Sequence, residues 1–358
     1  MLDWCSESCL TLVFFSPSPS RFFPAKLSVM VKVKEMEKSS RVLVTGGAGF
    51  IGSHIVDELV RRGCETIVMD ILSKDNLRNL EKSKDSITLI NGSVTNEKLV
   101  RDNVEVDIIF HEAACNLVSS IQSPMNALMV NVKGTLNILE SMKEKSKETV
   151  LIHGSTGSIY GQSLYSPQDE NHPCNPTNPY AISKFAAERY VNFFAQQYGL
   201  KTVCLRYYNV IGRRQNYGND GGLVSTFIMR VLNGKPPVIE GDGTQKRCFT
   251  GVEDVVKANV LAYEVEKGYG SAFNIAGDEV ITINELAALI CSFSEKPLKP
   301  LHVKSRPGEA YDFEPSIALA RKVLGYSAKN KLRDVIPDLM EWIRCELQIE
   351  QGSRRMSK

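Results

Sequence analysis

Three side chains near the middle of the sequence have the types and spacing of an acid–base site. Tyr180 and Lys184 are four positions apart in a stretch with helical character, so they would share one face of a helix. The ammonium group of Lys184 would favour the phenolate form of Tyr180 and lower its pKa, which is ordinarily about 10. Thr156 could place a hydroxyl in the same cleft. This set predicts a tyrosine that acts as a general base at neutral pH.

A second set of residues has the pattern of a nucleotide site. Gly46, Gly49 and Gly52 are spaced by three, between the apolar run 42–44 and an amphipathic helix. Glycines let the backbone approach a pyrophosphate, and a helix N-terminus offers free N–H groups. Asp70 follows a second strand about 20 residues on, where a carboxylate binds a ribose diol and repels a 2′-phosphate. The pattern favours NAD over NADP; the alternative is that Asp70 only caps the surface.

Alternating strand-like and helix-like segments would position both sets. This βαβα rhythm predicts a doubly wound parallel α/β sheet of the Rossmann type, with a smaller C-terminal lobe. Helices are expected over about 124–143, which should be the longest of those between the second and fifth strands, and over 179–198. The expected strands are 42–44, 66–69, 86–90, 106–110, 149–152 and 201–206.

The candidate residues follow the carboxyl ends of successive strands, where open α/β sheets bind their ligands. Ala113 and Ala114 come after the fourth strand, and their small side chains would let the backbone lie against a flat cofactor ring. Thr156 comes after the fifth strand. Each residue alone has a structural alternative: Thr156 as a turn residue, Tyr180 as packing and Lys184 as a solvated charge. Their agreement with the glycine turn favours the functional interpretation.

Composition excludes several classes of protein. Of the 358 residues, 43% are hydrophobic and 23% are charged, and the net charge is +2, so neither nucleic acid nor a membrane is expected as a partner. No apolar run approaches the ~20 residues of a membrane span. The nine cysteines lack metal-ligand spacing, so we expect no metal site and a cytoplasmic protein with reduced thiols.

The domain plan follows from changes in composition along the chain. Residues 1–38 read as a disordered or spurious extension, with a targeting peptide as the alternative, because the charged start of a secretory signal is missing. The remaining expected units are an NAD-binding domain at 39–206 to which a helix at 252–267 returns, a nucleotide-sugar lobe at 207–250 and 271–330, and a terminal helix and tail at 331–358, the helix spanning 332–347.

Several motifs give a specific resemblance from about residue 41 to about residue 325. TGGAGFIGSH at 45–54, NVKGT at 131–135, STGSIYG at 155–161, YAISK at 180–184 and RYYNVIGRRQ at 206–215 resemble NAD-dependent nucleotide-sugar epimerases of the extended short-chain dehydrogenase/reductase superfamily. The resemblance implies that Tyr180 is the base, that Lys184 assists it and that Thr156 holds the reacting sugar hydroxyl.

The resemblance also implies ligand-binding residues. Asn209, Arg247 in the GDGTQKRCF stretch and Arg306 in the RPG turn would bind the nucleotide-sugar diphosphate. Phe313, seven positions after Arg306, would face the sugar and crowd a 2-acetamido group. The implied cofactor site comprises Gly46, Gly49, Phe50, Ile51, Gly52, Asp70, Ser93, Val94, Ala113, Ala114, Asn131, Tyr180 and Lys184.

The sequence departs from the family pattern at four positions. Ser93 stands where an acidic residue usually contacts adenine, and Glu112 stands where a leucine usually follows the histidine. Cys248 and Ser316 each replace an aspartate. None of these changes replaces Tyr180 or the two residues expected to work with it.

The predicted function is therefore epimerisation of a nucleotide sugar, UDP-hexose at C4 by default, through a 4-keto intermediate in a homodimer. A dehydratase or decarboxylase is a rival, but those relatives carry an acid where Gly157 and Ser158 stand here. An NADPH-dependent reductase is disfavoured by Asp70. A non-catalytic NAD-sensing protein is disfavoured because Thr156, Tyr180 and Lys184 are all retained.

Overall fold

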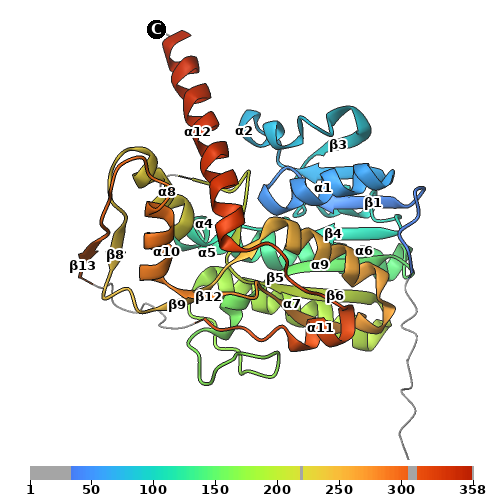
Figure 1. Cartoon of the computed structure of the whole chain (residues 1–358). Coiled ribbons are helices and arrows are strands. Elements are labelled where there is room, and N and C mark those ends of the chain that lie inside the picture. Colours follow the sequence, from blue (N-terminus) through green and yellow to red (C-terminus); the bar gives the residue numbers. More distant parts are fainter. Residues whose placement is uncertain (1–33, 218–220, 305–312, 357–358) are drawn as a thin grey trace, which may run out of the picture. The chain divides into compact units, whose positions relative to one another are not determined.

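The largest element is a parallel sheet. The computed structural model describes residues 34–217, 221–304 and 313–356, with side chains to 349. Within these residues, seven strands form one sheet in the order β11-β6-β5-β4-β1-β2-β3 (Figure 1). The order reverses between β1 and β4, which leaves a crevice at the carboxyl edge. The strands are β1 (Arg41–Thr45), β2 (Glu65–Asp70), β3 (Ile87–Asn91), β4 (Ile108–His111), β5 (Val150–Thr156), β6 (Lys201–Tyr207) and β11 (Ser271–Ile275).

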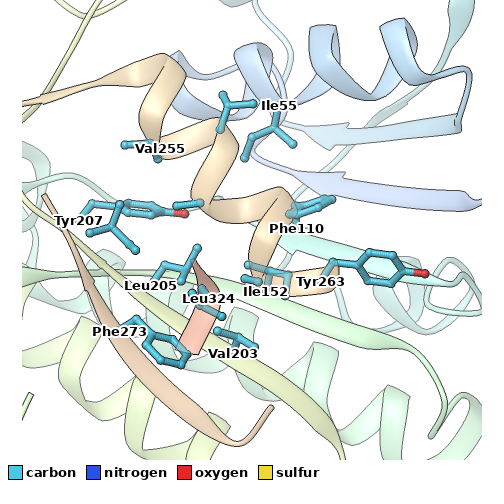
Figure 2. Packing of buried hydrophobic residues seen from close by; sticks show 14 of the residues in the cluster. Ile55, Phe110, Ile152, Val203, Leu205, Tyr207, Val255, Tyr263, Phe273 and Leu324 are labelled. Carbon is cyan, nitrogen blue, oxygen red and sulfur yellow. The ribbon is translucent and has the colours of Figure 1, made fainter. Parts of the chain in front are cut away.

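Helices cover both faces of this sheet, which explains its continuous apolar strands. Figure 2 shows the face where Ile55 and Val255 pack toward Leu205. A second apolar core, which contains Leu139 and Val191, fills the other face. The helices of the first face are α1 (Phe50–Arg62), α9 (Val252–Glu264) and α11 (Ala318–Leu324); those of the second are α3 (Glu97–Arg101), α6 (Gly134–Lys145) and α7 (Pro179–Tyr198).

A smaller layer has its own apolar core, built around Phe227, Ile290 and Ile336. It belongs to the same compact unit as the sheet, residues 32–358. Its helices are α8 (Leu223–Leu232), α10 (Ile283–Cys291) and α12 (Leu332–Met356). Its paired strands are β8 (Val238–Glu240) with β13 (Leu301–Val303) and β9 (Lys246–Cys248) with β12 (Val280–Thr282), while β7 (Val210–Ile211) pairs with β10 (Thr250–Gly251).

Helix α7, which carries Tyr180 and Lys184, begins and ends where the sequence predicts. The Asn178 side chain accepts a hydrogen bond from the Ala181 N–H at 2.9 Å, and Pro179 occupies the first helical position. Gly199 ends the helix in the left-handed conformation, with φ 72°. These caps fix which residues of α7 face the sheet.

The helix predicted at 124–143 is a composite. A short α4 (Leu117–Gln122) precedes α5 (Pro124–Ala127), a π-helical turn spans Leu128–Lys133, and α6 completes the run. A separate short helix, α2 (Lys74–Leu77), lies between β2 and β3 and is not part of this run. The run from α5 through α6 is the longest helical stretch between β2 and β5, as predicted, although a π-helical turn interrupts its α-helical geometry. A π-turn inserts an extra residue per turn, which propensity patterns do not reveal.

Four other boundaries differ from the sequence-based plan. Residues 34–38 pack on the domain rather than belonging to the extension: the Lys34 N–H donates to the Glu264 carbonyl at 2.8 Å, and Met36 is buried. The predicted lobe segment 271–330 begins with β11, which joins the main sheet beside β6. Helix α9 ends at Glu264 rather than at 267, and α12 continues to Met356.

A buried ion pair ties α7 to the sheet. Glu188 lies four positions after Lys184, on the helix face of the catalytic candidates, and its Oε1 is 2.6 Å from Nη2 of Arg206 on β6. The two side chains are 1% and 8% exposed. Ser155 on β5 donates a hydrogen bond to Glu188 Oε2 at 2.7 Å. The pair therefore joins α7, β5 and β6 beneath the carboxyl edge.

In the described part of the chain, no helix is both long and apolar enough to cross a membrane. The same residues contain no group of three or more His, Cys, Asp and Glu side chains that could hold a metal ion.

We predict that Glu188→Ala lowers the free energy of unfolding by about 3–5 kcal/mol, because the Arg206 charge would stay buried without its partner. Urea denaturation followed by circular dichroism measures the loss. Asp102→Ala, which removes an exposed ion pair with Lys98, is the matched control and should leave the curve nearly unchanged. Equal, small effects of the two substitutions would contradict a structural role for the buried pair.

Candidate active site

The glycine turn lies at the point where the strand order reverses. Gly46 has φ +71°, and a Cβ atom there would lie 2.5 Å from the Ala113 backbone nitrogen. A Cβ on Gly52 would lie 2.2 Å from the Gly46 carbonyl oxygen. Both positions therefore require glycine, and they bring the loops after β1 and β4 together.

The N-terminus of α1 is open to an anion. Gly49 caps it in an extended conformation, no side chain caps the free N–H groups, and the first turn, which holds Phe50 and Ile51, has no acidic residue. Free N–H groups and the positive end of the helix dipole suit a pyrophosphate. A cavity of about 450 Å³ lies here, lined by Ala48, Gly49 and Phe50 and by residues between Ser73 and Asn79. These features fit a dinucleotide.

Asp70 ends β2 beside this turn. Its Oδ2 accepts a hydrogen bond from the Ala48 N–H at 2.9 Å, and its Oδ1 accepts one from the Ile71 N–H at 2.7 Å. Burial raises the pKa of Asp70, and these N–H groups oppose that rise. The carboxylate thus stabilises the turn and still has lone pairs for a ribose diol.

The other predicted cofactor residues follow β3 and β4. Ser93 accepts hydrogen bonds from both the backbone and the hydroxyl of Thr95, at 3.2 and 2.9 Å, within its own turn. Val94 is buried against Gly134, where a Cβ would lie 2.5 Å from a Val94 methyl group. Ala113 is half-buried and Ala114 is exposed. These four residues border the crevice on either side of the glycine turn in strand order.

Asn131, one of the predicted cofactor residues, holds segments of the chain together through its amide. It is buried within the π-helical turn, and its Oδ1 accepts from the Cys115 N–H at 2.7 Å. Its Nδ2 donates to the Cys115 carbonyl at 3.2 Å and to Ser183 Oγ at 2.9 Å. Both ends of its amide thus bind the chain itself, and Asn131 fastens the loop after β4 to α7.

The structure brings the three catalytic candidates together. Thr156 ends β5 and is buried, and its hydroxyl lies close enough to Tyr180 to lower the pKa of that phenol. Lys184 is buried one helical turn further along α7, with Nζ 3.5 Å from Nε2 of His153. A phenol, a hydroxyl and a cation at the crevice are the parts of a proton-transfer site.

The ionisation of this group differs from the sequence-based prediction. Burial raises the pKa of Tyr180 to about 12, and the Thr156 hydroxyl opposes the rise. Burial also lowers the pKa of Lys184 to about 8. The expectation that Lys184 lowers the Tyr180 pKa is therefore wrong for the protein without ligands, because burial dominates and the Lys184 charge is not among the causes of the Tyr180 shift.

Two buried histidines beneath Lys184 stay neutral. His111 contacts the hydroxyls of Thr45 and Thr135, at 2.7 and 2.9 Å. Burial and then the Lys184 charge lower the His111 pKa to about 3, and the same causes lower the pKa of His153 well below its usual value. Because both histidines are neutral, neither adds a positive charge next to the Lys184 ammonium group.

The predicted substrate residues gather on the other side of the crevice. Asn209, with φ 34°, and Arg247 line one cavity of about 100 Å³, and Arg247 also lines an adjoining cavity of about 370 Å³. The Arg247 guanidinium carbon lies 5.2 Å from the centroid of the Phe313 ring. Gln215 lines both the first of these cavities and the cavity at the glycine turn. Arg306 lies outside the described residues.

The sequence did not predict the structural roles of three polar residues at this site, which are Glu188, Arg206 and Glu112. Glu188 and Arg206 support it from below, and Glu188 continues the i, i+4 spacing of Tyr180 and Lys184, so that spacing was an available signal. Glu112 was noted as a departure, yet its contact with Tyr207 could not be foreseen from spacing alone.

The fold and the crevice define a dinucleotide-binding α/β enzyme. Residues 42–276 match the model of the NAD dependent epimerase/dehydratase family, and the chain belongs to this family. The chain is 36% identical over 305 residues to a putative UDP-glucose 4-epimerase of Methanocaldococcus jannaschii, covering 85% of this chain and 98% of that protein. The cofactor is accordingly NAD.

Two further relatives show the range of the family. The structure of a UDP-glucose 4-epimerase from Thermotoga maritima, determined with UDP-glucose, superposes with a TM-score of 0.79 at 34% identity, covering 86% of this chain and 99% of that one. UDP-glucuronic acid decarboxylase 6 of Arabidopsis thaliana is 32% identical over 336 residues, covering 91% and 95% of the two chains. Identity alone therefore does not separate the two reactions.

We predict that the protein binds NAD far more tightly than NADP and that Asp70→Ala narrows the difference, because the carboxylate repels a 2′-phosphate. Calorimetric titration of both cofactors measures it. Asp70→Asn keeps an acceptor for the Ala48 N–H and removes the charge, so it should narrow the difference as well. Equal affinities of the wild type for the two cofactors would refute the role of Asp70.

Proposed function

We propose that this protein is an NAD-dependent nucleotide-sugar epimerase that inverts C4 of a UDP-hexose. The observation that carries the proposal is the grouping of Thr156, Tyr180 and Lys184 between the glycine turn and the cavities lined by Arg247. A sugar held by its diphosphate at Arg247 would extend toward these three side chains. The resemblance of the chain to UDP-glucose 4-epimerases supports the same reaction.

The residues divide the chemistry as follows. Tyr180 accepts the proton of the 4-hydroxyl, Thr156 orients that hydroxyl, and the Lys184 charge stabilises the phenolate. The NAD held at the glycine turn supplies reversible hydride acceptance at C4 when bound. Asn209 and Arg247 hold the diphosphate while the 4-keto sugar turns to present its other face. Tyr180 would then return the proton to the oxygen as a hydride returns to C4 on the new face, so the reaction would need no net oxidant.

The high pKa of Tyr180 is compatible with this role. Desolvation causes it, and desolvation also strengthens any opposite charge brought into the cleft. The positive charge of oxidised NAD beside Tyr180 would favour the phenolate. The base would therefore ionise in the complex rather than in the protein alone.

Decarboxylation or dehydration is the second candidate, favoured by the Arabidopsis relative. Family members with those activities carry an acid just after the hydroxyl residue. Here the short helical turn Gly157–Tyr160 places Gly157 and Ser158 at those positions. Ser158 donates its N–H to the Thr156 hydroxyl and accepts a hydrogen bond from that hydroxyl, both at 3.2 Å, and it offers no acid. This difference favours epimerisation.

A homodimer is part of the proposal. Helices α4 and α7 pack against each other, as do α5 and α7, and they carry large exposed apolar side chains. Ile121, Met125, Ile182 and Phe193 are each more than one-third exposed. A second copy that covered this face would remove it from water.

Assay of the purified protein with a panel of UDP-sugars, without added reductant, tests the reaction. We predict interconversion of UDP-glucose and UDP-galactose, and a loss of ~10²–10⁴ in kcat for Tyr180→Phe with NAD binding intact. Tyr190→Phe removes an exposed hydroxyl from the same helix and is the control. Near-wild-type turnover by Tyr180→Phe, or conversion of UDP-glucuronic acid to a pentose, would sink the proposal.

Phe313 generates a prediction about substrate size. Its N–H donates to the Lys246 carbonyl at 3.1 Å, and its ring lies against Arg247, which itself lines the cavity. Steric exclusion of this kind discriminates by ~1–3 kcal/mol. UDP-galactose should therefore have a higher kcat/KM than UDP-N-acetylgalactosamine. Phe313→Ser should raise kcat/KM for the acetylated sugar and so reduce the difference between the two substrates.

Phe313→Leu keeps much of the bulk without the aromatic contact to Arg247, so it separates size from loss of that contact. Its preference should stay near that of the wild type. A wild-type preference for the acetylated sugar would overturn the assignment.

A further inference from the structure

Glu112 lies at the centre of the carboxyl edge, directly after β4. Its Oε1 accepts a hydrogen bond from the Tyr207 hydroxyl on β6 at 2.8 Å. A Cβ on Gly154 of β5 would lie only 2.6 Å from its Oε2. A glycine in β5 thus makes room for a carboxyl group among the ends of three strands.

A further hydrogen bond, from Asn259, fixes the position of the Tyr207 hydroxyl. Asn259 on α9 donates its Nδ2–H to the Tyr207 hydroxyl oxygen at 2.9 Å and a second hydrogen to the Val255 carbonyl. Tyr207 is buried below α9, as Figure 2 shows, and burial together with the Glu112 charge raises its pKa, so it remains a donor. The Glu112 carboxyl therefore has a fixed position.

Charged and titratable groups surround Glu112 from each neighbouring element. Lys184 on α7 has its Nζ 3.5 Å from Nε2 of His153 on β5, and the next residue of β5 is Gly154, which lies against Glu112 Oε2. Tyr180 lies one turn earlier on α7, and His111 directly precedes Glu112 at the end of β4. The two histidines stay neutral, as described above. Burial raises the Glu112 pKa to about 7, against the Tyr207 hydrogen bond and the Lys184 charge. The negative charge of Glu112 in turn raises the pKa of both Tyr180 and Lys184.

We propose that Glu112 is a positioning residue for the catalytic pair: its carboxylate, fixed by Tyr207, stabilises the Lys184 ammonium and opposes the Tyr180 phenolate, and so sets the pH range in which the pair can act. The inference rests on the proposed role of Tyr180 as base. Activity needs Tyr180 ionised and Lys184 protonated. Because the Glu112 charge favours the protonated form of both, removing it should move both limbs of the pH profile to lower pH.

The test uses Glu112→Gln, which keeps an acceptor for Tyr207 and removes the charge. We expect the pH profile of its kcat/KM to shift to lower pH by about one unit. Such a shift is a tenfold change in the ratio of ionised to neutral Tyr180 at a fixed pH. The shift should be clearest on the alkaline limb, where wild-type Glu112 is ionised. Glu112→Asp restores the charge and should bring the profile back toward the wild type.

A second measurement does not depend on turnover. Absorbance titration of the tyrosinate band, with the Tyr180→Phe protein as background, should show Tyr180 ionising at lower pH in Glu112→Gln, both with and without NAD. Glu170→Gln is the matched control, because Glu170 is also a carboxyl whose burial raises its pKa but does not contribute to the pKa of Tyr180. Glu170→Gln should leave the pH at which Tyr180 ionises unchanged.

The outcomes separate this inference from the proposed function. A uniform loss of rate or melting temperature in Glu112→Gln, with both pH limbs and the tyrosinate titration at their wild-type positions, would show a purely structural role and overturn the inference. Retention of turnover by Tyr180→Phe would instead overturn the proposed function. Should Glu112→Gln fold poorly, Glu112→Leu and the Asp variant give the same comparison of charge with no charge.

Discussion

The site depends on the buried ion pair between Glu188 and Arg206. Tyr180, Lys184 and Glu188 follow one another at four-residue intervals on α7, so a force that fixes Glu188 also fixes the catalytic face of the helix. Glu188 is bound both by Arg206 on β6 and by Ser155, the residue before Thr156 on β5. A buried pair stabilises a protein only when its remaining polar atoms are satisfied, and here Arg206 also donates to the Tyr160 hydroxyl at 2.5 Å. The ion pair therefore holds α7, which carries the proposed base Tyr180, against β5, which carries Thr156.

Next to this ion pair lie Lys184 and Glu112, two buried side chains whose charged forms burial disfavours. Lys184 has a pKa of about 8 and Glu112 a pKa of about 7, so each depends on the other to remain ionised. The neutral histidines beneath them make contacts without adding positive charge. Such a site responds strongly to any charge that enters it, because the surrounding dielectric is low. That response suits the proposed role of Tyr180 as a base that ionises when its ligands are bound.

The sequence predicted the parts of the site that depend on local spacing. The glycines at 46, 49 and 52 and the four-residue step from Tyr180 to Lys184 are local features, and the sheet and α7 followed from them. Contacts between distant segments were not predictable in this way. Glu112 meets Tyr207 across 95 positions, and β11 joins the sheet only by pairing with β6. Asn131 belongs to a familiar motif, yet its use as a support depends on where Cys115 and Ser183 lie. The ionisation of Tyr180 also escaped prediction, since burial depends on the whole fold.

The proposed reaction inverts C4 by moving one hydrogen away from that carbon and back to it. The most direct test supplies the protein and its NAD with UDP-galactose that carries deuterium at C4, without any added reductant, and follows the products by NMR. The account predicts UDP-glucose that retains the deuterium at C4, with no net formation of NADH. UDP-glucose with protium at C4, or a product that has lost water, would contradict it.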